Sequence, residues 1–219
     1  MTRRARPPEF ATIVLAAGAS SRMGRPKMLL PVGDRTLLAA AVAPHLEAVN
    51  GRVVVVLGKD SRRIRAEAGL PVHPRLHLVV NRRWRDGMSS SLRRGLQVCG
   101  DADAVLIALG DQPGVTAGRV TRILAAWQPG VALVVPVVSA TRAAHPVLFA
   151  RCLWEELRGL RGDVGAREVV RRHWDRAVRV GVPPLVDVDV EEDYRNYLEG
   201  RTPAESGLEL PGPRPPRRR

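Results

Sequence analysis

Short apolar runs and amphipathic segments alternate along the chain from residue 10 to about residue 199. A continuous apolar run of strand length is typical of a strand buried on both faces, whereas apolar residues at helical spacing predict helices. The expected strands are Phe10–Ala16, Arg52–Leu57, Leu76–Val80, Asp103–Leu109 and Val131–Val135, with extended segments at Ala177–Val180 and Leu185–Val188. The expected helices are Thr36–Val49, whose second half Pro44 weakens, Asp60–Ala68, Ser89–Val98, Thr116–Trp127, Arg151–Gly159, Val164–His173 and Glu191–Leu198.

This alternation predicts an α/β fold of three layers, Rossmann-like, with a mostly parallel mixed sheet. We expect one domain over residues 10–200, a flexible N-terminus over residues 1–9 and a disordered Pro/Arg-rich tail over residues 201–219. Ligands of such sheets bind at the carboxyl ends of the strands. The loops after the first, third and fourth strands are therefore the places to look for chemistry.

Composition narrows the function classes. No apolar stretch reaches the roughly 20 residues that span a bilayer, so a membrane protein is not expected. The net charge of +13 suggests nucleic-acid binding as a function. However, the charge is spread along the chain, and Lys27 and Lys59 are its only lysines. We read this as a compositional bias toward arginine, and nucleic acid is an unlikely partner. Cys99 and Cys152 show no metal or redox spacing, and the start of the chain makes a poor export signal, so we expect a cytoplasmic protein.

The loop after the first strand carries the densest chemistry. It reads Leu15-Ala-Ala-Gly-Ala-Ser-Ser-Arg-Met-Gly-Arg-Pro-Lys27. Gly18 and Gly24 let the backbone turn and approach a ligand, and their N–H groups can cradle phosphate. Arg22 and Lys27 add charges suited to a polyphosphate. The spacing fits neither a Walker A loop nor GxGxxG. A plain glycine-rich connector is the alternative.

Two further segments follow strands. Asn81 leads through Gly87, read as a flexible turn, into Ser89, Ser90 and Ser91, which would line a helix N-terminus able to bind an anion or a base edge. Simple helix capping is the alternative there. Asp111 directly follows the fourth strand, where a carboxylate can hold Mg²⁺ shared with nucleotide phosphates. The alternative for Asp111 is a local turn before Pro113.

These segments resemble a known family. The stretch from Leu15 to Pro31 resembles the LAAGxSxRMGxxKxLLP signature of MobA-like nucleotidyltransferases, and more narrowly of molybdenum cofactor cytidylyltransferases. The resemblance covers residues 10–199 and includes the Gly110-Asp111-Gln112 motif and the acidic stretch from Val186 to Asp193, which has Val190 and Glu191 where the family has Thr and Pro. His145-Pro146 and the segment Gly162–Arg167 resemble the segments on the pterin side, although Ala144 replaces the usual Gly.

The resemblance implies transfer of CMP from CTP to the phosphate of molybdopterin, with Mg²⁺ as cofactor and a molybdenum hydroxylase as possible client. It implies catalytic roles for Arg22, Lys27 and Asp111, and metal ligation by Asp111 and Asp189. Asp187, on the same expected strand, would share a face with Asp189. The implied nucleotide-binding residues are Leu15, Ala16, Ala17, Gly18, Ser20, Arg22, Gly24, Lys27, Asn81, Gly87, Ser89 and Ser90. The implied acceptor-binding residues are His145, Pro146, Asp163, Gly165 and Arg167.

Several functions stay open at this stage. Family members that use GTP tend to carry LAGG, and the Cβ of Ala17 leaves less room beside the base, which favours CTP over GTP. The acceptor could be another phosphorylated compound, such as a sugar phosphate or phospholactate. A non-catalytic chaperone for molybdenum cofactor, or an RNA-binding protein using the arginine tail, is the alternative outside the transferases.

Overall fold

The computed structural model describes residues 6–20, 22–201 and 208–209. Its main sheet runs in the order β11-β8-β7-β9-β6-β1-β4-β5, with β10 beside β7. The strands are β1 (Phe10–Ala16), β4 (Val53–Leu57), β5 (Leu76–Val80), β6 (Ala104–Leu109), β7 (Leu133–Ser139), β8 (Arg142–Ala143), β9 (Val147–Ala150), β10 (Val178–Gly181) and β11 (Leu208–Glu209). A separate hairpin pairs β2 (Pro31–Val32) with β3 (Arg35–Thr36).

Most of the sheet is parallel. β1 lies between β4 and β6 and is parallel to both, and β5 extends the parallel set beyond β4. β9 is antiparallel to both of its neighbours, β6 and β7. The expected mostly parallel mixed sheet is confirmed. β9 was not expected, because four residues directly after His145-Pro146 give no periodic signal of their own.

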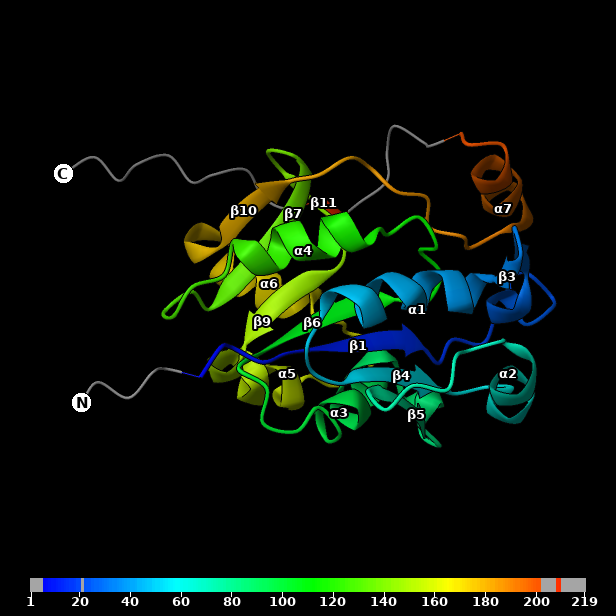
Figure 1. Ribbon diagram of the computed structural model, residues 1–219, viewed down its shortest axis with the longest axis horizontal. Coiled ribbons are helices and arrows are strands. Elements are labelled where there is room, and N and C mark those ends of the chain that lie inside the picture. Colours follow the sequence, from blue (N-terminus) through cyan, green and yellow to red (C-terminus); the bar gives the residue numbers. More distant parts are fainter. Residues whose placement is uncertain (1–5, 21, 202–207, 210–219) are drawn as a thin grey trace.

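Helices cover both faces of the sheet (Figure 1). α1 and α4 pack side by side on one face, and α3 packs with α5 against the other. A hydrophobic core lies on each face of the sheet, and alternate residues of β1 contribute to the two cores. Val14 packs in one core, whereas Ile13 and Leu15 pack in the other. The helices are α1 (Leu37–Ala48), α2 (Ser61–Glu67), α3 (Met88–Leu96), α4 (Ala117–Ala125), α5 (Trp154–Gly159), α6 (Arg167–His173) and α7 (Glu191–Leu198). Short 3-10 turns are η1 (Lys27–Leu29), η2 (Trp84–Asp86), η3 (Arg151–Leu153) and η4 (Trp174–Arg176).

Two local expectations are changed, and two contacts lie in the expected ends of the chain. α1 continues past Pro44 because both of its halves bury apolar side chains against the sheet. The segment 185–188 lies outside the sheet and is tied to the loop after β6, where Val188 N–H donates to the Asp111 carbonyl. Within the expected flexible N-terminus, Glu9 N–H donates to Asp103 Oδ2 at 2.8 Å. In the expected tail, Leu208–Glu209 pairs with β8, and residues 202–207 and 210–219 lie outside the described part.

The described ranges contain no helix with the length and apolar character that crossing a membrane requires.

His45 is a buried polar group in the core beside β1. It is 1% exposed, its Nδ1 lies 3.4 Å from Thr12 Oγ1, and its Nε2 has no hydrogen-bond partner among the described residues. Burial lowers the pKa of His45 from 6.5 to about 4. The folded protein therefore holds this imidazole neutral in a pH range where the unfolded chain would protonate it.

A pH dependence of stability follows. Between pH 6.5 and 4 the unfolded chain binds a proton at His45 that the folded chain does not, so His45 makes stability fall as pH falls through that window. The expected contribution is about 3 kcal/mol. Urea denaturation at several pH values should show a shallower acid-side loss for His45→Gln than for the wild type. Equal slopes for the two proteins would contradict the assignment.

Candidate active site

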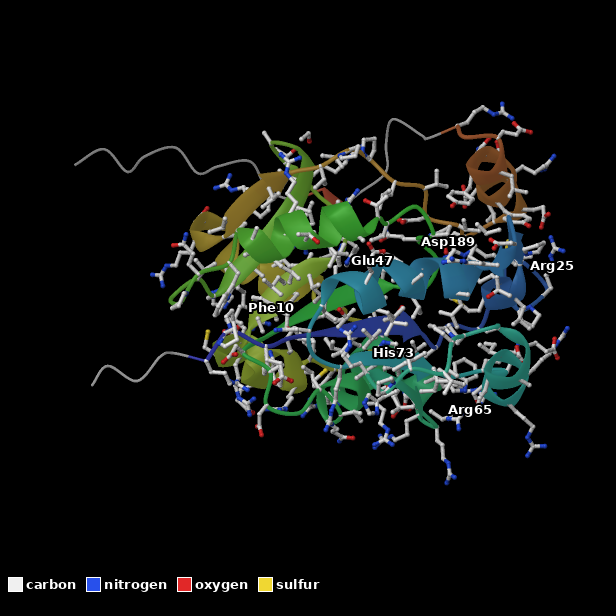
Figure 2. All side chains as sticks on the ribbon, in the orientation of Figure 1. Phe10, Arg25, Glu47, Arg65, His73 and Asp189 are labelled. Carbon is white, nitrogen blue, oxygen red and sulfur yellow. The ribbon has the colours of Figure 1, made fainter. Side chains whose placement is uncertain are left out.

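A cavity of about 890 Å³ opens at the carboxyl edge of the parallel strands. In Figure 2, Asp189 lies toward the end of the molecule where β1 stops, and Phe10, the first residue of β1, lies toward the other. The cavity therefore lies at the edge of the sheet where the sequence predicted the site. The expected site residues on its wall are Leu15, Ala17, Gly18, Ser20, Arg22, Lys27, Gly87, Asp111, Asp163 and Asp189.

The loop after β1 curls back so that its last residue faces the cavity. Ser20 and Gly24 both have positive φ, 50° and 64°, which turns the chain twice within a few residues. Ser20 Oγ accepts a hydrogen bond from the backbone N–H of Lys27 at 3.2 Å. This contact fixes the start of η1 and directs the Lys27 side chain inward. Ala16 lies buried at the end of β1, and Gly24 lies on the outer part of the loop.

Lys27 lies between the two aspartates expected to bind metal. Its Nζ donates to Asp111 Oδ2 at 2.6 Å, to Asp189 Oδ1 at 2.9 Å and to the Val188 carbonyl at 3.2 Å. Lys27 is only 8% exposed. Arg22 reaches Asp189 Oδ2 at 3.3 Å from a largely exposed position. Two carboxylates and two cationic side chains thus meet at one point on the cavity wall.

The pKa values of these groups reflect their mutual contacts. Burial disfavours the charged form of Lys27, but the charge of Asp111 and the hydrogen bonds to both carboxylates outweigh it, so the pKa of Lys27 lies above its usual value. Burial would raise the pKa of Asp189, but the hydrogen bond and charge of Lys27, together with Arg22, lower it. Lys27 and Asp189 are therefore charged at neutral pH.

Asp189 is held in place by the start of α7. The Asp193 carboxylate accepts hydrogen bonds from the backbone N–H groups of Asp189 and Val190, both at 2.9 Å. These hydrogen bonds satisfy backbone N–H groups at the start of α7, where the N-cap residue Val190 has no polar side chain. Tyr194, buried on the same helix, donates its hydroxyl to the Pro31 carbonyl. The last helix is thereby tied to the chain that leaves the first loop.

Asp187 and Gln112 form a second polar pair at the same edge. Asp187 lines the cavity, and Gln112 Nε2 donates to its Oδ1. Burial raises the pKa of Asp187, and the nearby charge of Asp111 adds to this. The sequence placed Asp187 on a strand beside Asp189, whereas both lie in an irregular segment that brings them to one wall. Gln112 was not singled out, although the Gly-Asp-Gln-Pro sequence contains it.

The donor set fits a divalent cation that is shared with a ligand. Asp111 Oδ1 is buried and has no hydrogen-bond partner within the described ranges. Those ranges contain no cluster of three or more His, Cys, Asp or Glu side chains arranged to hold a metal alone. Mg²⁺ commonly binds through one or two carboxylates and takes its other ligands from water and phosphates. Asp111 and Asp189 match that pattern.

The serines at the start of α3 are engaged inside the protein. Ser89 Oγ donates to the Gly162 carbonyl at 2.7 Å, and Ser90 Oγ donates to the Gly87 carbonyl at 2.8 Å. Asn81 Nδ2 donates to Ser90 Oγ at 2.8 Å and to Ser91 Oγ at 3.0 Å. Asn81, Ser89 and Ser90 therefore brace the turn that carries Gly87, and Ser91 is the serine that reaches the cavity wall.

The segment 162–165 docks on the N-terminus of α3. Asp163 Oδ1 accepts a hydrogen bond from Met88 N–H at 3.2 Å, so Asp163 caps α3 and not the helix that follows it. A Cβ on Gly87 would lie 2.3 Å from the Gly162 carbonyl carbon, and a Cβ on Gly165 would lie 2.6 Å from Met88 Sδ. Gly87 is thus a close-packed position with φ of 92°, not the flexible turn that the sequence suggested.

Substitution of Gly87 tests this packing. Gly87→Ala must adopt a backbone conformation that is essentially restricted to glycine and must push away the Gly162 backbone. We expect a loss of about 2 kcal/mol or more in the free energy of unfolding, measured by urea denaturation. Gly118→Ala, at an exposed position on α4 with open space around it, should instead gain about 0.5–1 kcal/mol. A neutral Gly87→Ala would show that the segment 162–165 is not packed as described.

Four of the residues expected to bind the acceptor, His145, Pro146, Gly165 and Arg167, are not part of the cavity lining. His145 is partly buried, its Nδ1 lies 3.3 Å from the Ile107 carbonyl, and the peptide bond to Pro146 is cis. Burial lowers the pKa of His145, and the charges of Asp187 and Asp111 oppose this. His145 thus lies close behind the carboxylates. Arg167 begins α6 with an exposed side chain.

Part of the cavity wall beside the first loop was not among the site residues predicted from the sequence. Trp84 and Met88 line the cavity, and the Arg85 guanidinium carbon lies 4.5 Å from the centre of the Trp84 ring. A Cβ on Gly58 would lie 2.3 Å from the Ala17 carbonyl oxygen and 2.8 Å from Trp84 Cβ, so this wall packs tightly against the first loop. The signal that could have identified this wall is Trp84, the one aromatic residue in the segment from Asn81 to Leu96.

Together the fold and the cavity define an α/β nucleotidyltransferase. The chain belongs to the MobA-like NTP transferase domain family, whose model matches residues 12–178. Nicotine blue oxidoreductase of Paenarthrobacter nicotinovorans is 35% identical over 167 residues, which cover 73% of this chain and 80% of that protein.

Solved structures agree. Rv0371c of Mycobacterium tuberculosis in complex with manganese is 30% identical with a TM-score of 0.73, covering 87% of this chain and 98% of that one. A nucleotidyl transferase from Methanothermobacter is 25% identical with a TM-score of 0.71, covering 88% of this chain and 97% of that one.

Proposed function

We propose that the protein transfers CMP from CTP to the phosphate of molybdenum cofactor and releases pyrophosphate. One observation carries the proposal: the signature loop, Asp111 and Asp189 meet in one cavity, with Lys27 hydrogen-bonded to both carboxylates. A phosphate monoester is already ionised at neutral pH, so the reaction needs no general base. It needs two polyanions held in line and their repulsion neutralised.

Each group then has a defined task. The backbone around Gly18 binds phosphate oxygens, and Arg22 and Lys27 hold the triphosphate and stabilise the departing pyrophosphate. Asp111 and Asp189 would hold Mg²⁺, which would supply positive charge to offset the charge of the phosphates. The manganese bound to a relative with a similar fold supports a divalent cation in this role.

The nucleotide base is proposed to lie beside Ala17. Ala17 is 8% exposed, lines the cavity and packs against Gly58 and Trp84. The added Cβ at residue 17 narrows this end of the cavity, which favours a pyrimidine. The acceptor is proposed to approach from the side of Asp163 and Gly87, which line the same cavity. Molybdenum cofactor as the acceptor rests on the resemblance of the segments at His145 and Gly162.

An anaerobic turnover assay tests the proposal. Purified protein, Mg²⁺ and molybdenum cofactor are supplied with either CTP or GTP, and the dinucleotide product is detected together with pyrophosphate. Product from CTP alone is the expected result. Product from GTP would overturn the role of Ala17, and product only from a sugar phosphate or phospholactate would overturn the acceptor. Tight cofactor binding without pyrophosphate release would point to a chaperone.

A further inference from the structure

The hydrogen-bonding capacity of Lys27 is fully used by the wall of the cavity. An ammonium group has three N–H donors, and the three acceptors around Nζ are Asp111 Oδ2, Asp189 Oδ1 and the Val188 carbonyl, at 2.6, 2.9 and 3.2 Å. In this arrangement Lys27 cannot also hold a triphosphate. Its proposed role with nucleotide therefore requires that the ammonium leave these carboxylates.

The ammonium also fills the place that a shared cation would need. A Mg²⁺ or Mn²⁺ ion that bridges two carboxylates lies roughly 2.1 Å from an oxygen of each. Lys27 Nζ already lies within 2.9 Å of one oxygen from each aspartate, so both cations cannot stand between Asp111 and Asp189. Of the four oxygens of Asp111 and Asp189, Asp111 Oδ1 is the buried one without a hydrogen-bond partner in the described part of the chain, and by itself it offers one ligand.

Charge balance favours simultaneous entry of metal and nucleotide. Arg22 and Lys27 offset Asp111 and Asp189 one for one, so these four side chains together carry no net formal charge, while Asp187 on the same cavity wall accepts a hydrogen bond from Gln112. A divalent cation added alone would face two cationic side chains in a partly buried setting, where repulsion is poorly screened. A triphosphate removes this repulsion, because its oxygens attract Lys27 and Arg22 away from the carboxylates. The same oxygens add ligands for the metal.

We propose that Lys27 is a built-in competitor of the divalent cation: its ammonium occupies the position between Asp111 and Asp189 until a nucleotide triphosphate draws it away. The metal then binds tightly only together with nucleotide. This inference rests on the metal site of the proposed function and adds an order of binding to it. The flexible four-carbon stem of lysine permits the exchange.

Manganese binding without nucleotide or acceptor tests the competition. Mn²⁺ titrations followed by electron paramagnetic resonance compare the wild type, Lys27→Met and Lys59→Met. Methionine keeps an unbranched side chain, shorter by one atom, and removes its charge, and Lys59 is the only other lysine. We expect Lys27→Met to bind Mn²⁺ about tenfold or more tightly than the wild type, and Lys59→Met to match the wild type. Equal or weaker binding by a folded Lys27→Met would overturn the inference.

A second measurement needs no variant. In protein labelled with ¹⁵N-lysine, the two side-chain ammonium groups give separate signals, and the buried Lys27 signal should be protected from exchange. Mg²⁺ alone at millimolar concentration should leave that signal in place, whereas Mg²⁺ with a non-hydrolysable CTP analogue should shift or remove it. A signal that persists with both ligands bound, or that Mg²⁺ alone displaces, would contradict the competition.

These two measurements distinguish failure of the proposed metal site from failure of the competition alone. If no protein form binds Mn²⁺ with or without the CTP analogue, the metal site of the proposed function fails and the inference fails with it. If Mn²⁺ binds with the same affinity to the wild type and to Lys27→Met, the metal site stands and only the competition is refuted. Neither measurement depends on the identity of the acceptor.

Discussion

Asp111→Asn should abolish metal-dependent nucleotidyl transfer, with a loss of about 10³-fold or more in turnover. The substitution keeps the size of the side chain but removes the charge that a divalent cation needs, and such a cation supplies several kcal/mol of transition-state stabilisation. Lys27 keeps its contacts with Asp189 and the Val188 carbonyl, so the fold of the site should survive. Initial rates over a Mg²⁺ titration measure the effect.

Asp34→Asn is the matched control for this change, because the Asp34 side chain is 91% exposed on the turn between β2 and β3. It should retain wild-type turnover and an unchanged Mg²⁺ titration curve. If Asp111→Asn instead showed the wild-type Mg²⁺ dependence, Asp111 would have no role as a metal ligand.

Lys27→Ala should lower turnover by about 10²-fold or more, the scale of losing one electrostatic contact to the transition state. Under the competition argued above, the same change removes a rival of the cation, so the loss should appear in kcat while the Mg²⁺ concentration for half-maximal rate falls or stays constant. Steady-state kinetics with both CTP and Mg²⁺ varied separate the two effects.

Lys59→Ala provides the control for charge and size. Lys59 is an exposed residue whose Nζ lies 3.4 Å from the Ala19 carbonyl, so its loss should leave kcat near the wild-type value. A Lys27→Ala variant with near-wild-type turnover would remove Lys27 from the set of catalytic residues, whatever its effect on metal binding.

The elements with strong local signals were predictable from the sequence. β1 has the bounds expected for it, because seven apolar or small residues in a row suit a strand buried on both faces. Thr36 and Thr116 cap α1 and α4 with their side chains, as N-cap residues do. β9 could not be predicted, because its place between β6 and β7 depends on partners more than ten residues away in the chain.

The site was predictable to a similar depth. The first loop and Asp111 follow buried strands, and the fold rule for α/β sheets brings such residues to one edge. The contact of Lys27 with Asp189 spans 162 residues and depends on how α7 docks, which no local pattern contains. The serines after Gly87 suggested an anion site because their spacing is that of a helix start, but tertiary packing gives their hydroxyls to neighbouring carbonyls and Asn81.

The docking of α7 has a consequence for how the protein matures on the ribosome. The loop after β1 and Asp111 leave the exit tunnel before Asp189, whose backbone N–H is bound by Asp193 of α7, the helix that Tyr194 ties to the Pro31 carbonyl. A nascent chain that has been synthesised only as far as β10 therefore still lacks one of the two carboxylates. Under the proposed function, the protein should be able to bind metal and nucleotide together only after α7 has been synthesised. A shorter nascent chain should not form this complex.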